Sequence, residues 1–228
     1  MSNFAIEDHY FEFSSNKFFR DNSDDTDLAV YGRKHPKGLG SRAYLEVQNL
    51  VKRDYLVGKV DYLTTVTVDW KQQSASAVEA NGKVSYLVAS GQGAVSGGYS
   101  DVVKANVKLV EFGINEGPMI TILNQDAAGA LKFLGDEGAN GRIVNRIWIG
   151  MAATIEEQFT SALASGGSVS ATVEGASLVL GVQGKGTSST RVSLNVSSGT
   201  PFAYGLCKVS NWDDHRTKVV RLSDDWYG

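Results

Sequence analysis

The clearest pattern in this chain is an alternation of small polar and apolar residues over its last third, residues 163–207. Every second position there is mostly Val, Leu or Ala, and a period of two places such residues on one face of a β-strand. Only Glu174, Lys185 and Arg191 carry charge in this segment. It predicts weakly charged strands, suited either to a sandwich core or to a hairpin with one face toward lipid.

Strand patterns also fill the first part of the chain. Residues 1–20 predict one or two aromatic-rich strands, followed by an acidic turn at residues 21–27. Residues 33–41 predict a basic loop, because Pro and Gly interrupt them. The first part of residues 45–63 is compatible with a helix, and residues 55–69 turn to β character.

Residues 59–112 read as a long β block. Asn81-Gly82 within it is a strong signal for a two-residue hairpin turn, because both central positions of a type I′ turn need a positive φ. Over residues 103–114 apolar and polar positions alternate, which predicts a strand with one basic face. The alternating residues are Val103, Ala105, Val107 and Leu109 against Lys104, Asn106 and Lys108.

The next part of the chain mixes strand and helix signals. Residues 119–123 predict a strand, residues 126–138 a short helix, and residues 142–153 a second strand. Thr154 and Glu157 have the spacing of a capping box, and a helix of about ten residues is expected after them, ended by Gly166-Gly167.

These patterns predict an α+β fold: a twisted, mainly antiparallel sheet with long hairpins and a few short packing helices. We expect one domain over residues 1–212. Residues 213–228 then form a short polar C-terminal tail.

The net charge and the cysteine content limit which partners and which covalent links we expect for this protein. The formal net charge is −3 and the sequence pI is about 5.6, which argues against nucleic-acid binding because that needs a basic face. The single cysteine, Cys207, excludes an intramolecular disulfide. No apolar run reaches the length of a spanning helix, and the N-terminus lacks signal-peptide character. We therefore expect a cytoplasmic protein that reaches a membrane only on activation.

No catalytic, cofactor or metal motif stands out. Asp21 to Asp27 have the spacing of a calcium loop, but its sixth position is Thr26 instead of Gly. The three histidines have no short-range partners that would suggest a metal site. We expect no enzyme and no cofactor. A carboxylate pair, Asp213 and Asp214 with His215, is the enzymatic alternative, although neighbouring strand residues point in opposite directions.

Basic residues are a further candidate feature. Near a membrane surface each Lys or Arg contributes about 1 kcal/mol of attraction to anionic headgroups. The candidates for lipid contact are Lys52, Arg53, Lys104, Lys108, Arg142 and Arg146.

The C-terminal residues also follow a known order of elements. A strand (RIVNRIWIGMAA) leads into a helix (TIEEQFTSALA), then an amphipathic hairpin, then a last strand (GTPFAYGLCKV, residues 199–209). This order resembles the pore-forming domain of gasdermins. The length is similar to the compact bacterial or fungal members, which have a short C-terminal tail in place of a large inhibitory domain.

The resemblance implies a latent pore-forming protein that acts in cell death or antiviral defence. It would oligomerise with its own copies on anionic lipid after release of the tail, for which a protease is a possible agent. The regions expected to insert are residues 78–110 and 165–197. Their inserting candidates are Val84, Tyr86, Val88, Val107, Leu109, Leu178, Leu180, Val182, Val192 and Leu194. The latch candidates in the tail are Val219, Val220, Leu222 and Trp226.

A different class of function fits the same strands. A non-enzymatic structural or assembly protein of a phage or secretion apparatus could add its strands to the sheet of a neighbour. Behaviour with lipid separates the two: an assembly protein associates in solution without vesicles.

Overall fold

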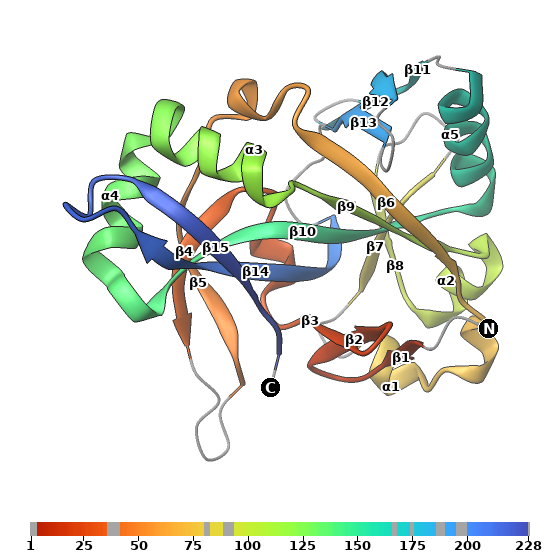
Figure 1. Ribbon diagram of the computed structural model, residues 1–228. Helices are drawn as coiled ribbons and strands as arrows, with labels where there is room; N and C mark the ends of the chain where they lie inside the picture. The colour runs from red at the N-terminus through yellow and green to blue at the C-terminus, as the bar shows by residue number, and fades with distance from the viewer. Residues whose placement is uncertain are drawn as a thin grey trace.

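A computed structural model describes residues 4–35, 42–79, 83–88, 94–165, 168–173, 176–185, 190–194 and 200–227 (Figure 1). These residues form a curled, mostly antiparallel sheet with short helices packed on it, which confirms the α+β prediction. The strands are β1 (Phe4–Ile6), β2 (Tyr10–Phe13), β3 (Asn16–Phe19), β4 (Val30–His35), β5 (Tyr44–Leu50), β6 (Val60–Thr67), β7 (Val84–Leu87), β8 (Ala94–Gly97), β9 (Lys108–Gly113), β10 (Gly141–Met151), β11 (Ser168–Val173), β12 (Ala176–Lys185), β13 (Thr190–Ser193), β14 (Pro201–Trp212) and β15 (Val219–Asp225).

Most helices are short. The α-helices are α1 (Ala75–Val78), α2 (Tyr99–Ala105), α3 (Glu116–Thr121), α4 (Ala128–Glu137) and α5 (Ala153–Ser165). One π-helical turn, η4 (Ile122–Asp126), and four 3-10 turns complete the set, the latter being η1 (Ser23–Asp25), η2 (Arg53–Leu56), η3 (Trp70–Gln72) and η5 (Gly138–Asn140).

Strand β10 is the centre of the sheet. It pairs antiparallel with β14, β9 and β4, and parallel with β7. All of its residues but Arg146 are buried. Its nearly continuous apolar sequence, IVNRIWIGM, explains this position, because a strand covered on both faces has no wet side to reserve for polar residues.

The two faces of the sheet carry separate apolar cores. On one face Ile143 and Ile147 pack with residues of α3, α4 and α5. On the other face Trp148 meets the rings of Phe11, Phe13 and Phe18 edge-on, with ring centroids 4.9–5.5 Å apart. Such edge-to-face contacts add to the free energy gained by burying the rings. The predicted aromatic strands of residues 1–20 therefore form a cover over the β10–β14 region.

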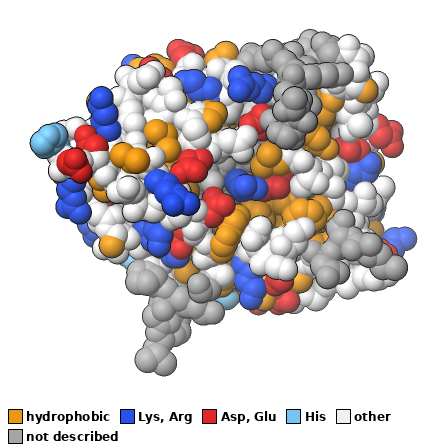
Figure 2. Space-filling model, viewed as in Figure 1, with side chains coloured by type: hydrophobic (Ala, Val, Ile, Leu, Met, Phe, Trp, Pro, Cys, Tyr) orange, Lys and Arg blue, Asp and Glu red, His pale blue; other side chains and the backbone are white. Residues whose placement is uncertain are grey.

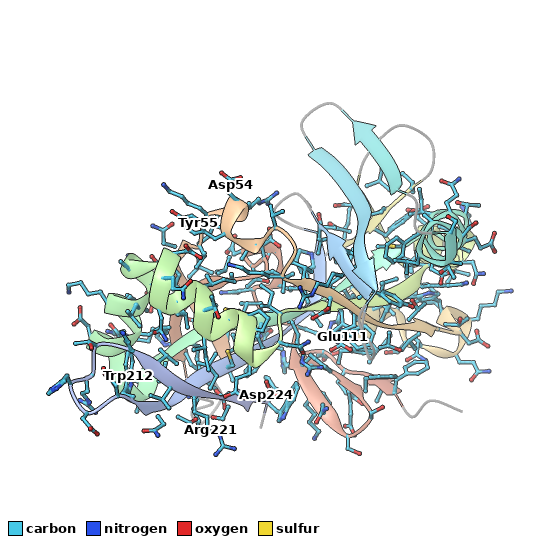
Figure 3. The ribbon with its side chains drawn as sticks, turned by 45° about the horizontal axis from the view of Figure 1, so that its top comes forward. Asp54, Tyr55, Glu111, Trp212, Arg221 and Asp224 are labelled. Carbon is cyan, nitrogen blue, oxygen red and sulfur yellow. The ribbon has the colours of Figure 1, made fainter. Side chains whose placement is uncertain are left out.

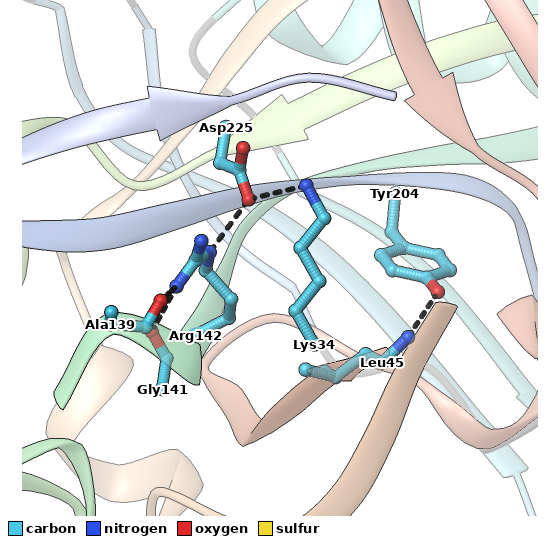
Figure 4. A network of polar contacts seen from close by, with 7 residues as sticks. All are labelled: Lys34, Leu45, Ala139, Gly141, Arg142, Tyr204 and Asp225. Carbon is cyan, nitrogen blue, oxygen red and sulfur yellow. Dashed lines mark hydrogen bonds and ion pairs between the residues drawn. The ribbon is translucent and has the colours of Figure 1, made fainter. Parts of the chain in front are cut away.

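The sheet curls so that β5 approaches β14. The hydroxyl of Tyr204 on β14 accepts a hydrogen bond from the Leu45 amide at 3.0 Å and donates one to the Asp21 carbonyl at 2.8 Å. Burial raises the pKa of Tyr204, so the phenol stays protonated and can do both. Figure 4 shows the contact with Leu45.

Several predicted elements were wrong. The first part of residues 45–63, whose pattern is compatible with a helix, lies in strand β5, because Leu45 and Val47 alternate with polar neighbours and pair with β4. The predicted basic loop begins inside β4, which ends at His35. The predicted strand at residues 119–123 is helical, and Met119, Ile122 and Leu123 point into the core at a spacing typical of a helix.

The predicted strand over residues 103–114 is also wrong in its first half. Helix α2 runs to Ala105, Asn106 ends it in the left-handed conformation with φ 48°, and only then does β9 begin. The Asp101 carboxylate accepts the Gly98 amide at the start of the helix. Lys104 and Lys108 therefore do not share a strand face.

Helix α5 and strand β10 confirm the predicted strand–helix order. The helix begins at Ala153, and the Ala152 carbonyl accepts the amides of Ile155 and Glu156, so Thr154 lies inside the first turn instead of capping it. Asn81-Gly82 lies outside the described residues. The element before it is helix α1, so the hairpin predicted there does not join two strands; β7 and β8 form the hairpin instead.

Candidate functional site

Strands β11, β12 and β13 form a three-stranded antiparallel extension at one edge of the sheet, called the edge meander here. Six regular pairs join β11 to β12, among them Val169 with Leu180 and Ala171 with Leu178. The apolar positions of β11 thus lie opposite apolar positions of β12, whereas Thr172 lies opposite Ser177, Ser168 opposite Gly181 and Ser170 opposite Val179. The register of the hairpin follows the alternation from which it was predicted.

Within the described part of the chain, the edge meander joins the rest of the sheet through β13 alone. Three residue pairs link β13 to β6, and one of them places Val192 opposite Val60. Both of these side chains are buried, at 0% and 2% exposure. Leu194, just past the strand, packs partly buried against the same core. In Figure 3 the β11–β12 hairpin stands away from the body of the molecule.

Helix α5 leads from the body into the meander. Its buried residues Ile155, Phe159 and Leu163 recur every fourth position, and Phe159 meets the ring of Tyr62 on β6 at 5.5 Å. The Lys108 ammonium on β9 donates to the Glu156 carboxylate and fixes the start of the helix. Among the described residues, the meander is therefore held by the β13–β6 pairs and by contacts of α5 with β11 and β12.

The other region expected to insert, residues 78–110, is not a continuous hairpin. It holds the short β7–β8 hairpin, helix α2 and the start of β9. Four of its apolar candidates are fully or nearly buried and Val88 is half-buried; the four are Val84, Tyr86, Val107 and Leu109. Of the candidates on β12, Leu178 and Leu180 pair with β11 and Val182 pairs with Val192.

The six basic candidates do not gather into one patch. Lys52, Arg53 and Lys104 are exposed, and Arg53 forms an ion pair with Asp27 at 2.9 Å. On the face in Figure 2, Lys and Arg side chains are interspersed with acidic ones.

The other three basic candidates form ion pairs within the fold. Lys108 pairs with Glu156, Arg142 with Asp225 at 2.6 Å, and Arg146 with Glu111 at 3.2 Å. Four of the six lipid-contact candidates therefore have ion-pair partners within the fold, and the exposed Arg53 is one of them.

The C-terminal tail is part of the sheet. Strand β15 pairs with β14, and its residues Val219 and Leu222 are buried in the main core, while Val220 is 53% exposed. Trp226 is partly buried between the ring of Phe18, at 5.2 Å, and the Arg146 guanidinium, at 5.9 Å.

Charged side chains tie the end of β15 to two other strands. Asp225 accepts hydrogen bonds from Lys34 on β4, at 2.8 Å, and from Arg142 on β10 (Figure 4). Arg142 also donates to the carbonyls of Ala139 and Gly141. Burial would raise the pKa of Asp225, but the two cations outweigh it and lower that pKa below 3.8.

A second charged group lies between β9, β10 and β15. Burial raises the pKa of Glu111, opposed by Arg146 and assisted by the nearby carboxylate of Asp224. Asp224 accepts a hydrogen bond from the Asn145 amide at 2.9 Å. Figure 3 labels Glu111 and Asp224. The Arg146–Glu111 ion pair joins β10 to β9, and the Asn145–Asp224 hydrogen bond joins β10 to β15, so the cluster holds strands together.

Chemistry-bearing residues elsewhere have structural partners. Asp213 accepts the Lys218 amide and the Thr217 amide and hydroxyl in the β14–β15 turn, and these hydrogen bonds lower its pKa. Asp214 and His215 lie exposed in that turn. Burial raises the pKa of the Cys207 thiol, which makes it a poor nucleophile.

Within the part of the chain that the structure describes, no three His, Cys, Asp or Glu side chains are grouped to bind a metal ion. None of the described helices has both the length and the apolar character needed to cross a bilayer.

Sequence reasoning missed the ion pairs that join distant strands. Lys34 and Asp225, for example, are 191 residues apart. Nothing in the local pattern around either residue indicates the other.

Comparisons with known proteins found no match at any level. No family model matches the chain, no curated protein matches its sequence, and no solved structure matches its fold.

Proposed function

We propose that the protein is a latent pore-forming protein. Its edge meander detaches from β6, enters an anionic bilayer and pairs with the meanders of other copies to line a pore. Permeabilisation of a membrane in this way would serve cell death or defence.

The main observation in support of this proposal is how few residue pairs attach the edge meander to the rest of the sheet. In the described sheet, β11–β13 are attached to the body by three residue pairs between β13 and β6, with Val192 at the buried end. A segment with few buried contacts opens at a lower free energy than the core of its fold. The β10–β14 region, buried on both faces, can stay intact meanwhile.

Length and charge also support insertion. Strand β12 has ten residues, and a tilted strand needs about 9–11 to cross the hydrocarbon core of a bilayer. Strand β11 and residues 176–184 contain no charged side chain; Lys185 and Arg191 stand near the strand ends. A Lys or Arg costs about 2–4 kcal/mol at the bilayer midplane on the lipid face and little near the interface.

The structure gives less support to insertion of residues 78–110 and to a latch role of β15 over the meander. Insertion of the former would require α2 to unfold and core residues such as Val107 and Leu109 to leave the interior. Strand β15 pairs with β14 and packs on α3, so it does not lie over the meander. Release of the tail would act by loosening the sheet as a whole.

The test changes the body and leaves the meander sequence intact. Val60→Asp places a charge in the β6 site that holds Val192, and should free the meander. Val66→Asp is the matched control, because Val66 is equally buried on the same strand but pairs with Leu109 of β9. Dye release is measured from vesicles of phosphatidylglycerol and phosphatidylcholine, alongside circular dichroism to follow folding.

We expect Val60→Asp to release dye at least about tenfold faster than the wild type, because the stability lost by burying an unpaired charge exceeds 1.4 kcal/mol. Val66→Asp should not reproduce this gain. Equal leakage from both variants would point to general unfolding and would overturn the proposal, as would the absence of leakage from a folded Val60→Asp protein.

A solution-assembly role is the second candidate, because β11 has only one strand partner, β12, in the described sheet and leaves an edge open to a strand of another chain. Filaments or other open assemblies formed without vesicles, together with no dye release, would establish it in place of the pore.

A further inference from the structure

Five strands of the described sheet have a single strand partner and therefore a free edge: β1, β5, β8, β11 and β15. A free edge presents unpaired amide and carbonyl groups to any other strand, and soluble proteins protect such edges by covering, shortening, bending or charging them. The five edges differ in how far they carry this protection.

Strand β15 is covered. The Asn124 side chain accepts the Val219 amide at 2.8 Å and donates to the Val219 carbonyl at 2.9 Å, and the Glu116 carboxylate accepts the Leu222 amide at 2.8 Å. Helix α3 and the π-helical turn after it thus use up the outer backbone groups. Arg221, Asp224 and Asp225 add charge to the same strand.

Three further edges are protected by shape. Strands β1 and β8 have only three and four residues. Strand β5 is longer, but Gln48 is an extra residue opposite the Tyr31–Gly32 step, which makes a bulge, and Glu46 places a carboxylate on the strand. A bulge twists an edge away from a flat partner.

Within the residues that the structure describes, β11 has no second strand partner, and it lacks the shape and charge that protect the other edges. Its six residues, SVSATV, include no charge, proline or glycine, and its pairing with β12 shows no register shift. Val and Thr favour the extended conformation. An uncharged six-residue strand at a regular edge is the arrangement that pairs most readily with another chain.

We propose that β11 is a dimerisation edge, where two copies of this protein pair antiparallel about a two-fold axis through Ala171. A symmetric contact of this kind uses the same patch on both copies and closes on itself. The inference concerns the protein before any membrane is present and does not depend on the pore proposal.

The side chains of β11 favour this register, because it opposes Val with Val, whereas a two-fold axis through Ser170 would oppose Val169 with the smaller Ala171. When Ala171 lies opposite its own copy in the second molecule, Val169 of one copy lies opposite Val173 of the other. In the same register, Ser170 lies opposite Thr172. Apolar residues then oppose apolar ones and hydroxyls oppose hydroxyls, which stabilises cross-strand pairs. Moving the register by one residue opposes Val with Thr or Ser. A short strand pair buries far less than the roughly 1,200 Å² of a stable interface, so we expect a weak dimer.

Disulfide formation tests the register. Directly opposed residues of an antiparallel pair have Cα atoms about 4.5–5.5 Å apart, within the range of a disulfide. Ala171→Cys should therefore form a linked dimer under mild oxidation without lipid. Val169→Cys is the matched control on the same strand, because its two copies would lie about 13 Å apart, four steps of about 3.3 Å. Cys207 is 2% exposed and does not compete.

We expect Ala171→Cys to link at least about tenfold faster than Val169→Cys, since only the former pair meets disulfide geometry. Equal rates, or faster linkage of Val169→Cys, would overturn the proposed register.

Sedimentation velocity of the unmodified protein gives a second measurement, with a dimer expected to grow in as concentration rises. Ala171→Lys, which opposes two charges on the axis, should abolish it. Val47→Lys on the protected β5 edge should not. A protein that stays monomeric at all concentrations would overturn the dimer proposal without bearing on the vesicle experiment with Val60→Asp. A dimer without lipid, together with no dye release, would instead contradict only the pore proposal.

Discussion

Single side chains account for how the end of the chain is held. Asp225 receives Lys34 and Arg142 from two other strands, and Arg142 is only 7% exposed. A buried cation that loses its carboxylate keeps the cost of its desolvation without compensation. The residues expected to act as a latch thus depend on charges that are far apart in the sequence.

Asp225→Asn should lower the free energy of unfolding by about 2 kcal/mol, because it leaves two partly buried cations without their anion. Urea unfolding at neutral pH measures the change. The matched control is Asp136→Asn, which breaks the exposed Lys132–Asp136 pair on α4 and should cost under about 0.5 kcal/mol.

The same variant has a pH signature. The pKa of Asp225 is lowered in the folded protein, so between that value and 3.8 the unfolded chain binds the proton more readily. The stabilisation is present above about pH 4 and is lost as pH falls further. Wild type and Asp225→Asn should converge in stability at acid pH, and a gap that persists would contradict the role assigned to this carboxylate.

At the level of elements, the sequence predicted correctly those segments whose hydrophobic pattern fits only one type of secondary structure. The apolar run of β10 and the every-fourth-residue stripe of α5 fit one structure each. Residues 103–109 fit two, because Val103, Ala105 and Val107 alternate through a segment that is helical up to Ala105. The αL residue Asn106 separates the two halves, and side-chain hydrophobicity does not reveal such a backbone change.

The β4–β5 hairpin depends on one glycine. A Cβ on Gly32 would fall onto the carbonyl oxygen of Glu46 across the bulge. Gly32→Ala should destabilise the protein by about 1–3 kcal/mol and speed amide exchange in β4 and β5, since overpacking forces the strands apart.

Gly117→Ala is the control for this substitution. A Cβ at Gly117 meets nothing within 4 Å, and alanine favours a helix, so α3 should become slightly more stable. Equal effects of the two changes in thermal unfolding would contradict the close approach at the bulge.

At the scale of the whole molecule, the sequence identified the fold class and the weakly charged strands of residues 163–207. It did not identify how they attach. Whether such strands lie in the core or at an edge depends on which strand lies next to them, and the β13–β6 contact joins residues more than a hundred positions apart. The candidate site could therefore be named from local pattern, but its small attachment to the body could not.

The central claim is that the edge meander must leave β6 for the protein to permeabilise a membrane. Cysteines at Val60 and Val192, which are paired in register, would lock β13 to β6 in a disulfide. Ile143→Cys with the native Cys207 locks β10 to β14 and serves as the control, because those residues are also paired.

The decisive measurement is dye release from anionic vesicles by the Val60→Cys/Val192→Cys protein before and after reduction, in one sample. We expect no release while the disulfide is intact and, once it is reduced, release at least as fast as from the wild type, with no such dependence for the control lock. Release that is the same in both states, or absent from both, would contradict it.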